Sequence, residues 1–187
     1  MFDQPFPPRE LKSPESSSEM ESILVVDNLT KHFDNFSLQN VSFHLPRGYV
    51  MGFIGPNGSG KSTTIKLILN LLHKDGGQIK VFGYDNLQHE LTIKDRIGVV
   101  FDENHYYEEL SVREMAQIVA SFYKYWEPKS FDKCLRDFDL NPKQKIKKLS
   151  KGMKMKFSLA VALSHGAELL IMDEPTAGLD PIARTSF

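Results

Sequence analysis

The chain has 187 residues, with 23 basic and 24 acidic side chains, a formal net charge of -1 and a single cysteine. This length suits one domain with room for an inserted subdomain, and it excludes a multi-domain assembly. The balanced charge gives no general electrostatic attraction to nucleic acid or to an anionic membrane, and Cys134 alone cannot form an internal disulfide.

Residues 1–20 contain four of the ten prolines and three consecutive serines, a composition that predicts a disordered tail. The alternative is a strand or helix fastened to the body of the protein. The first residues lack the pattern of a secretory signal, and no run approaches the ~18 apolar residues of a transmembrane helix. We therefore expect a cytoplasmic protein.

From residue 23 the chain changes to short apolar runs. Residues 23–26 and 36–45 predict two antiparallel strands. The run 50–54 is mostly apolar and is followed by glycine, which is typical of a strand buried on both faces. Apolar residues at helical spacing then predict a helix over 62–73. The local order is strand, glycine-rich turn, helix.

Two more strands are predicted at 78–82 and 97–101. The period then becomes helical over 112–125 and 130–138, which indicates a helical insertion punctuated by prolines.

A further helix is predicted after Ser150, through Leu163. It is followed by an apolar strand, 168–172, that ends in Asp173. The residues after Pro181 are typical of the first turn of a helix.

Residues 55–62 read GPNGSGKS, the spacing of a phosphate-binding loop. Glycines allow positive φ angles, so that successive N–H groups can surround phosphate oxygens at a helix N-terminus. Lys61 would reach the β- and γ-phosphates, and the Ser62 hydroxyl would bind Mg²⁺. A glycine-rich turn without a ligand is the alternative, which the flanking strand and helix disfavour. The candidate nucleotide-binding residues are Gly55, Asn57, Gly58, Ser59, Gly60, Lys61, Ser62 and Thr63.

The acidic end of the last predicted strand would complete such a site. Asp173 can bind Mg²⁺ directly or through water, and Glu174 would orient or deprotonate the attacking water. A helix cap or a surface pair of acids is the alternative. A phosphate loop elsewhere in the chain favours the catalytic interpretation, because its metal needs a carboxylate.

Residues 149–153, LSKGM, resemble the signature sequence of ATP-binding cassette (ABC) ATPases, and 175–180, PTAGLD, resemble the D-loop of that family. The phosphate loop, the helical insertion, the signature and the acidic strand also stand in the family's order. The resemblance covers the chain from about Ser22 to its end. The resemblance implies an α/β fold: a P-loop NTPase core with an antiparallel β subdomain and an inserted α-helical subdomain. The expected domain is 21–187, in which 21–103 and 160–187 form the nucleotide-binding core and 104–159 the helical subdomain.

The same resemblance implies an ATP-binding and ATP-hydrolysing subunit that uses ATP and Mg²⁺. It would couple ATP-driven dimerisation to export by a separate membrane subunit, at the inner face of the cell membrane. In the implied head-to-tail homodimer, Ser150 and Gly152 contact the γ-phosphate held by the other subunit. The adenine-stacking aromatic falls at Phe33, with Phe36 as the alternative, and core packing is a further explanation for Phe33.

Three positions depart from the family pattern. Asp102 stands where the family has a glutamine that contacts Mg²⁺, and this carboxylate is expected to alter the metal dependence or the coupling. Lys151 replaces the commonest glycine of the signature. The last histidine is His165, so the family's downstream histidine is missing, which indicates a fragment or an ATP binder with impaired turnover.

Two clusters and two further functions complete the sequence-based hypotheses. The lysine run between 143 and 156 favours a solvated face beside a nucleotide over a nucleic-acid surface, since aromatic residues are scarce in it. Packing of the helical insertion explains most of the aromatic residues between 106 and 126, and a partner groove is the alternative. The competing functions are a non-hydrolysing regulatory or structural ATP binder and a soluble ABC protein.

Overall fold

The computed structural model of the chain describes residues 22–101 and 106–173, and the chain divides into two compact units, Met1–Ile93 and Lys94–Phe187. The expected tail at 1–20 and the expected helix after Pro181 lie outside the described residues. In the described ranges, no helix is both long enough and apolar enough to cross a bilayer.

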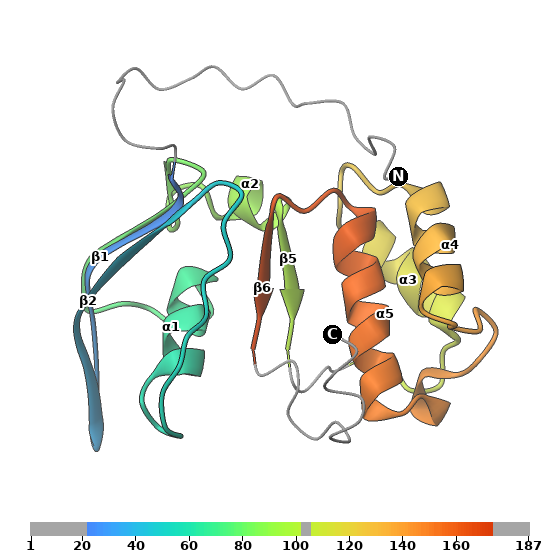
Figure 1. The fold of residues 1–187 in the computed structure, drawn as a ribbon, viewed down its shortest axis with the longest axis horizontal. Coiled ribbons are helices and arrows are strands. Elements are labelled where there is room, and N and C mark those ends of the chain that lie inside the picture. Colours follow the sequence, from blue (N-terminus) through green and yellow to red (C-terminus); the bar gives the residue numbers. More distant parts are fainter. Residues whose placement is uncertain (1–21, 102–105, 174–187) are drawn as a thin grey trace. The chain divides into compact units, whose positions relative to one another are not determined.

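The first unit is built on a four-stranded antiparallel sheet with the order β2-β1-β3-β4 (Figure 1). Its strands are β1 (Ser22–Phe33), β2 (Phe36–Pro46), β3 (Gly76–Val81) and β4 (Tyr84–Asp85). The predicted strands at 23–26, 36–45 and 78–82 are therefore confirmed. A two-residue turn joins β1 to β2, because Phe33 pairs directly with Phe36.

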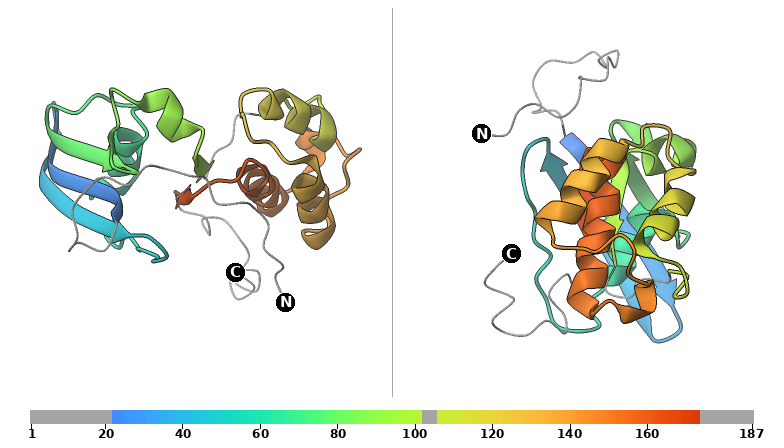
Figure 2. Two further views of the ribbon diagram at one scale, coloured as in Figure 1. Left: turned by 90° about the horizontal axis from the view of Figure 1, so that it is seen from above. Right: turned by 90° about the vertical axis from the view of Figure 1, so that its right-hand side faces the viewer.

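Helix α1 (Lys61–Ile68) lies on one face of this sheet, and α2 (Glu90–Lys94) follows β4 (Figures 1 and 2). Apolar side chains of β1 and β3 are buried, and so are Ile65, Leu67 and Ile68 of α1. The largest fully buried side chains of this unit are Val26, Leu29, Leu67, Ile79 and Val81.

The predicted strand at 50–54 is wrong. Residues 50–54 adopt no strand, and Val50 and Ile54 are each 99% exposed. Phe53 packs edge-on against Phe43 of β2, with ring centroids 5.0 Å apart, but the segment joins neither described sheet. An apolar run becomes a buried strand only when neighbouring strands satisfy its backbone groups, and hydrophobicity alone does not reveal those neighbours.

The helix predicted over 62–73 is present but shorter. It ends at Ile68, and Asn70 then adopts a left-handed conformation, with φ 54°. The buried amide of Asn86 donates hydrogen bonds to the carbonyl oxygens of Leu67 and Ile68, at 3.0 and 3.3 Å. Both carbonyls belong to the last turn, which lacks further helical N–H donors, so Asn86 supports the end of α1 together with the Asn70 N–H that also reaches Leu67.

The second unit contains the parallel pair β5 (Ile97–Val100) and β6 (Leu169–Met172), which confirms the strands predicted at 97–101 and 168–172. Arg96 and Glu168 precede these strands and form a bidentate ion pair, with Nε to Oε1 at 2.7 Å and Nη2 to Oε2 at 3.0 Å. Because Arg96 is only 4% exposed, this pair is partly removed from water and fixes the strands at their first residues.

The helices of the second unit are α3 (Val112–Ala120), α4 (Pro128–Asp137), the 3₁₀ turn η1 (Ile146–Lys148) and α5 (Lys151–Ser164). The predicted helices are confirmed, although α3 ends five residues before the expected 125. A capping box between Ser111 and Glu114 begins α3, and a proline in the first turn begins α4. Helix α5 packs against α3 and α4 (Figure 2).

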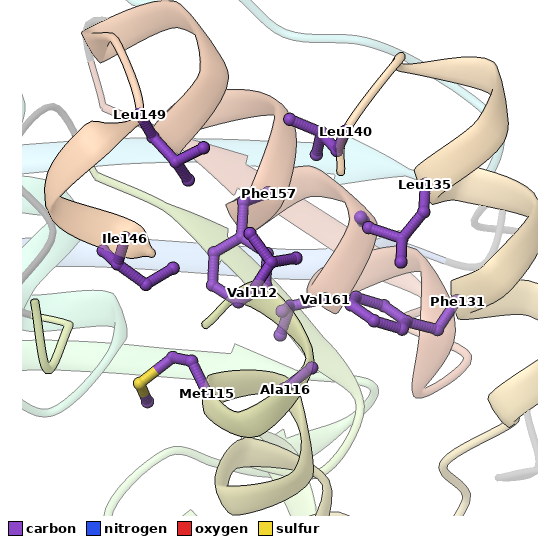
Figure 3. Close-up of a cluster of buried hydrophobic side chains, with 11 residues drawn as sticks. Val112, Met115, Ala116, Phe131, Leu135, Leu140, Ile146, Leu149, Phe157 and Val161 are labelled. Carbon is purple, nitrogen blue, oxygen red and sulfur yellow. The ribbon is translucent and has the colours of Figure 1, made fainter. Parts of the chain in front are cut away.

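One apolar cluster holds these helices together, with Phe157 of α5 fully buried among side chains of α3 and α4 (Figure 3). Its members are Val112, Met115, Ala116, Phe131, Leu135, Leu140, Ile146, Leu149, Phe157, Ala160 and Val161. Helix α5 runs without a break through residue 160, where the resemblance implied a subdomain boundary. The division at that residue stays a prediction.

Candidate functional site

The candidate phosphate loop leads directly into α1, as its sequence predicts. Gly58 and Gly60 have φ angles of 80° and 94°, in the left-handed region that side chains disfavour. A Cβ on Gly60 would also lie 2.9 Å from Leu38 Cδ1, and one on Gly55 would lie 2.8 Å from Ser59 Oγ. The glycines therefore permit both the turn of the backbone and its close approach to neighbouring atoms.

Lys61, the first residue of α1, extends its side chain back over this loop. Its Nζ donates hydrogen bonds to the carbonyl oxygens of Gly55, at 2.9 Å, and Pro56, at 3.0 Å. Ser62 and Thr63 follow it in the first helical turn, where backbone N–H groups lack intrahelical partners. A cation and several N–H donors thus gather around one short loop, which is the arrangement that binds phosphate oxygens.

Two aromatic rings lie at the tip of the β1–β2 hairpin in the same unit. Phe33 and Phe36 are stacked, with centroids 6.2 Å apart and an interplanar angle of 30°. Phe36 is half-buried, and its Cζ lies 3.1 Å from the position of a Cβ on Gly60, so it packs against the phosphate loop. Phe33 is 42% exposed and is the ring that offers a face to a planar ligand.

Asp75 supports this hairpin tip, and the sequence analysis did not identify it. Its Oδ1 accepts a hydrogen bond from Lys31 Nζ at 2.8 Å, and its Oδ2 accepts one from the His32 backbone N–H at 2.7 Å. Lys31 Nζ also lies 5.7 Å from the centroid of the Phe33 ring. The Lys31 hydrogen bond, and then that of His32, lower the pKa of the Asp75 carboxyl, so it is ionised at neutral pH.

In the second unit, Ser150 and Gly152 of the candidate signature lie at the start of α5. Ser150 is the N-cap, and its Oγ accepts a hydrogen bond from the Met153 N–H at 3.2 Å. A hydroxyl and the N–H groups of a first helical turn suit an anion. The same geometry is that of an ordinary helix cap, so both interpretations of Ser150 fit the structure.

The lysine run before and inside α5 is partly paired with acids that the sequence did not connect to it. Glu109 accepts from Lys145 at 3.2 Å and from Lys147 at 2.8 Å, and Glu108 pairs with Lys154 at 3.4 Å. The hydrogen bonds from Lys147 and then from Lys145 lower the pKa of the Glu109 carboxyl. Neighbouring carboxylates reduce the positive potential of this face, which weakens the case for a nucleic-acid surface.

The aromatic residues between 106 and 126 divide into two groups. Tyr106, Tyr123 and Trp126 pack against Phe157, His165 and Phe131 respectively, at centroid distances of 4.9, 3.8 and 5.4 Å. Tyr107, Phe122 and Tyr125 are exposed. Packing therefore explains half of this set, and the remaining residues carry no argument for a groove.

Asp173 follows β6 directly, and its N–H donates to the Val100 carbonyl oxygen at 2.9 Å, which continues the β5–β6 ladder by one residue. The predicted role of this carboxylate in binding Mg²⁺ stays a prediction. In the described ranges, no group of three histidine, cysteine or acidic residues is suited to hold a metal ion. Asp102, Glu174 and the candidate D-loop, 175–180, lie outside the described residues.

Comparisons with known proteins, by family profile, by sequence and by structure, all point to the same family. The profile described as "ABC transporter" matches residues 38–177. The chain is 36% identical over 166 residues to the bacitracin transport ATP-binding protein BcrA of Bacillus licheniformis, covering 87% of this chain and 54% of that protein. It is 34% identical over 168 residues to the linearmycin resistance ATP-binding protein LnrL of Bacillus subtilis (strain 168), with coverages of 87% and 54%.

Among solved structures, an ATP-binding subunit of an ABC transporter has a TM-score of 0.77 and 31% identity, and the match covers 88% of this chain and 71% of that one. The chain spans about half the length of the curated relatives named above, at 54% of each. The α/β fold implied by the P-loop resemblance is thereby confirmed, since the solved relative shares it over most of this chain. The motifs, the matched profile and the solved relative agree, and the chain belongs to the ABC transporter family.

Proposed function

We propose that this chain is an ATP-binding and ATP-hydrolysing subunit of an ABC transporter, and that it couples ATP-driven dimerisation to export by a separate membrane subunit. The observation that carries the proposal is the phosphate loop, in which two glycines with positive φ precede α1 and Lys61, its first residue, reaches back over the loop. The names of the relatives, which concern bacitracin transport and linearmycin resistance, support export as the direction.

ATP binding follows from the chemistry of the first unit. The triphosphate of ATP would replace the carbonyl oxygens of Gly55 and Pro56 as the partner of the Lys61 ammonium group. Backbone N–H groups of the loop would donate to the remaining phosphate oxygens. The exposed ring of Phe33 would stack on adenine, since a base and an aromatic ring both present flat apolar faces.

Magnesium fits the oxygen donors that the chain provides. The Ser62 hydroxyl and the Asp173 carboxylate would hold the ion together with phosphate oxygens, and Asp102 would be a further ligand or a group near it. Bound Mg²⁺ neutralises charge that develops on the phosphates during transfer.

For hydrolysis, Glu174 would hold the attacking water and accept its proton. Ser150 and Gly152 would donate to the γ-phosphate of ATP on a second copy of the chain, because the start of α5 carries N–H donors and the Ser150 hydroxyl. Such a homodimer would lie at the inner face of the membrane, bound to the membrane subunit. The partner is then a protein, and no nucleic acid is required.

The experiment compares the wild-type protein with Glu174→Gln, using the complete protein together with its membrane subunit. Phosphate release should stop in the variant while ATP affinity is kept, because the amide preserves the shape of the side chain but accepts no proton. If the wild-type protein binds ATP without releasing phosphate, it is a regulatory ATP binder instead. If it binds no ATP, the proposal is wrong.

A further inference from the structure

The tip of the β1–β2 hairpin extends beyond the residues of β1 that pair with β3. The ladder between β1 and β3 ends at the pair Thr30↔Gly76, three residues before Phe33. From that point the backbone of the hairpin tip pairs with β2 alone. A two-stranded ribbon in water is only marginally stable, so the position of its tip depends on additional contacts.

Asp75, which directly precedes β3, provides those contacts. Its own N–H donates to the Thr30 carbonyl oxygen at 2.9 Å, and its carboxylate accepts from Lys31 Nζ and from the His32 N–H. The bond from His32 therefore ties the backbone of β1 to Asp75 beyond the last β1–β3 pair. Hydrogen bonds that involve a charged group are stronger than neutral ones.

His32, whose N–H binds Asp75, is adjacent to Phe33, the candidate adenine-stacking residue. Phe33 follows His32 directly, and the ammonium group of Lys31, held by Asp75, lies 5.7 Å from the centre of its ring. Phe33 also stacks on Phe36, which packs against Gly60 of the phosphate loop. Asp75 therefore binds the residues next to Phe33, and the phosphate loop contacts Phe36, within the same unit.

We propose that Asp75 is a positioning residue for nucleotide binding, which holds the hairpin tip and the Lys31 ammonium group so that the Phe33 ring stays in place to receive the base. This inference rests on the proposed function, since it requires that Phe33 stacks on adenine. Asp75 itself would not contact the nucleotide. Its effect should therefore appear in binding of the base and not in binding of the phosphates.

The test measures the affinity of the full chain for two probes, ATP and inorganic tripolyphosphate, by calorimetric titration. Asp75→Asn keeps the size of the side chain and removes its charge, so the ion pair with Lys31 is lost. We expect ATP affinity to fall about two- to fivefold, the scale of one cation–π or charged contact, while tripolyphosphate affinity is unchanged. Asp34→Asn is the matched control, because Asp34 lies in the hairpin turn and takes no part in the Asp75 contacts.

A double variant tests whether Asp75 acts through Phe33. If it does, adding Asp75→Asn to Phe33→Ala should weaken ATP binding no further than Phe33→Ala alone. Equal losses for ATP and tripolyphosphate would overturn the inference, and so would wild-type ATP affinity in Asp75→Asn. Failure of the wild-type protein to bind ATP would instead refute the proposed function.

A second variant covers the case in which Asp75→Asn does not fold. Lys31→Gln removes the same ion pair and leaves the bond between His32 and Asp75 in place. It should also lower ATP affinity without changing tripolyphosphate affinity. Unchanged ATP affinity in this variant would show that the ion pair does not position the ring.

Discussion

The Nζ atom of Lys61 lies 2.9 Å from the carbonyl oxygen of Gly55, so the lysine side chain bridges the first and last parts of the phosphate loop. A loop closed in this way places its cation over the concavity that the backbone N–H groups surround. The contact also means that a triphosphate must compete with two carbonyl oxygens for the ammonium group. Phosphate oxygens should win this competition because they carry full negative charge.

Replacing this lysine should remove most of the affinity for ATP. Lys61→Ala loses charged hydrogen bonds to the phosphates, and we expect affinity to fall about 10- to 100-fold in a calorimetric titration. Lys66→Ala is the control, because Lys66 is an exposed lysine on the same helix, and it should bind ATP as the wild-type protein does. Equal affinity for ATP in Lys61→Ala and Lys66→Ala would contradict the assignment of the loop.

The two hairpin aromatics should separate into a binding residue and a structural residue. Phe33→Ala removes an exposed ring, so it should weaken ATP binding about tenfold and leave the urea midpoint nearly unchanged. Phe36→Ala empties a half-buried position beside Gly60, and it should lower the free energy of unfolding by about 2 kcal/mol. The opposite assignment, a stable Phe36→Ala that no longer recognises adenine, would make Phe36 the stacking residue.

Gly60→Ala should destabilise the first unit for two reasons. The φ of 94° costs about 1 kcal/mol for any side chain. The new Cβ would also meet Leu38 Cδ1 at 2.9 Å in a buried environment, which adds about 1 kcal/mol or more of overpacking. Gly83→Ala isolates the first cost, since Gly83 has a φ of 79° and no atom within 4 Å of its added Cβ. Similar denaturation midpoints for these two variants would show that Leu38 moves aside freely.

Two arginine–carboxylate pairs in the second unit should differ strongly in their contribution to stability. Glu168→Ala leaves Arg96 buried without its bidentate partner, which should cost about 3 kcal/mol. Asp132→Ala breaks the exposed pair with Arg113, and it should cost less than about 1 kcal/mol. Both values come from chemical denaturation monitored by circular dichroism. A loss at Glu168 as small as that at Asp132 would show that water replaces the missing carboxylate.

Local patterns predicted most of the elements, because the elements are built from local rules. The alternation of apolar residues predicted β1 and β2, and the glycine spacing at 55–62 predicted the start of α1. The helix after Ser150 was also predicted, since a helical period that follows an N-cap serine is a local pattern. In each case the residues that determine the structure lie within a few positions of one another.

The features that the sequence did not reveal depend on partners far along the chain. Residues 50–54 look like a buried strand, but no described strand pairs with them. Asp75 precedes a pair of glycines and looks like a turn residue, because its partners Lys31 and His32 lie more than 40 positions earlier, at separations of 44 and 43. Glu109 likewise meets lysines 36 and 38 residues later. Periodicity carries no information about such contacts.

The parallel pairing of β5 with β6 has a consequence for the order of folding. Arg96 and Glu168, at the start of these strands, are 72 residues apart in the chain, and the helices α3, α4 and α5 lie between them. Closing so long a loop is entropically costly until the intervening segment has become compact. The helical cluster around Phe157 should therefore form first, and Asp173 should reach its final place in one of the last steps. Pulse-labelling of amide hydrogens during refolding would show protection in α5 before protection in β6.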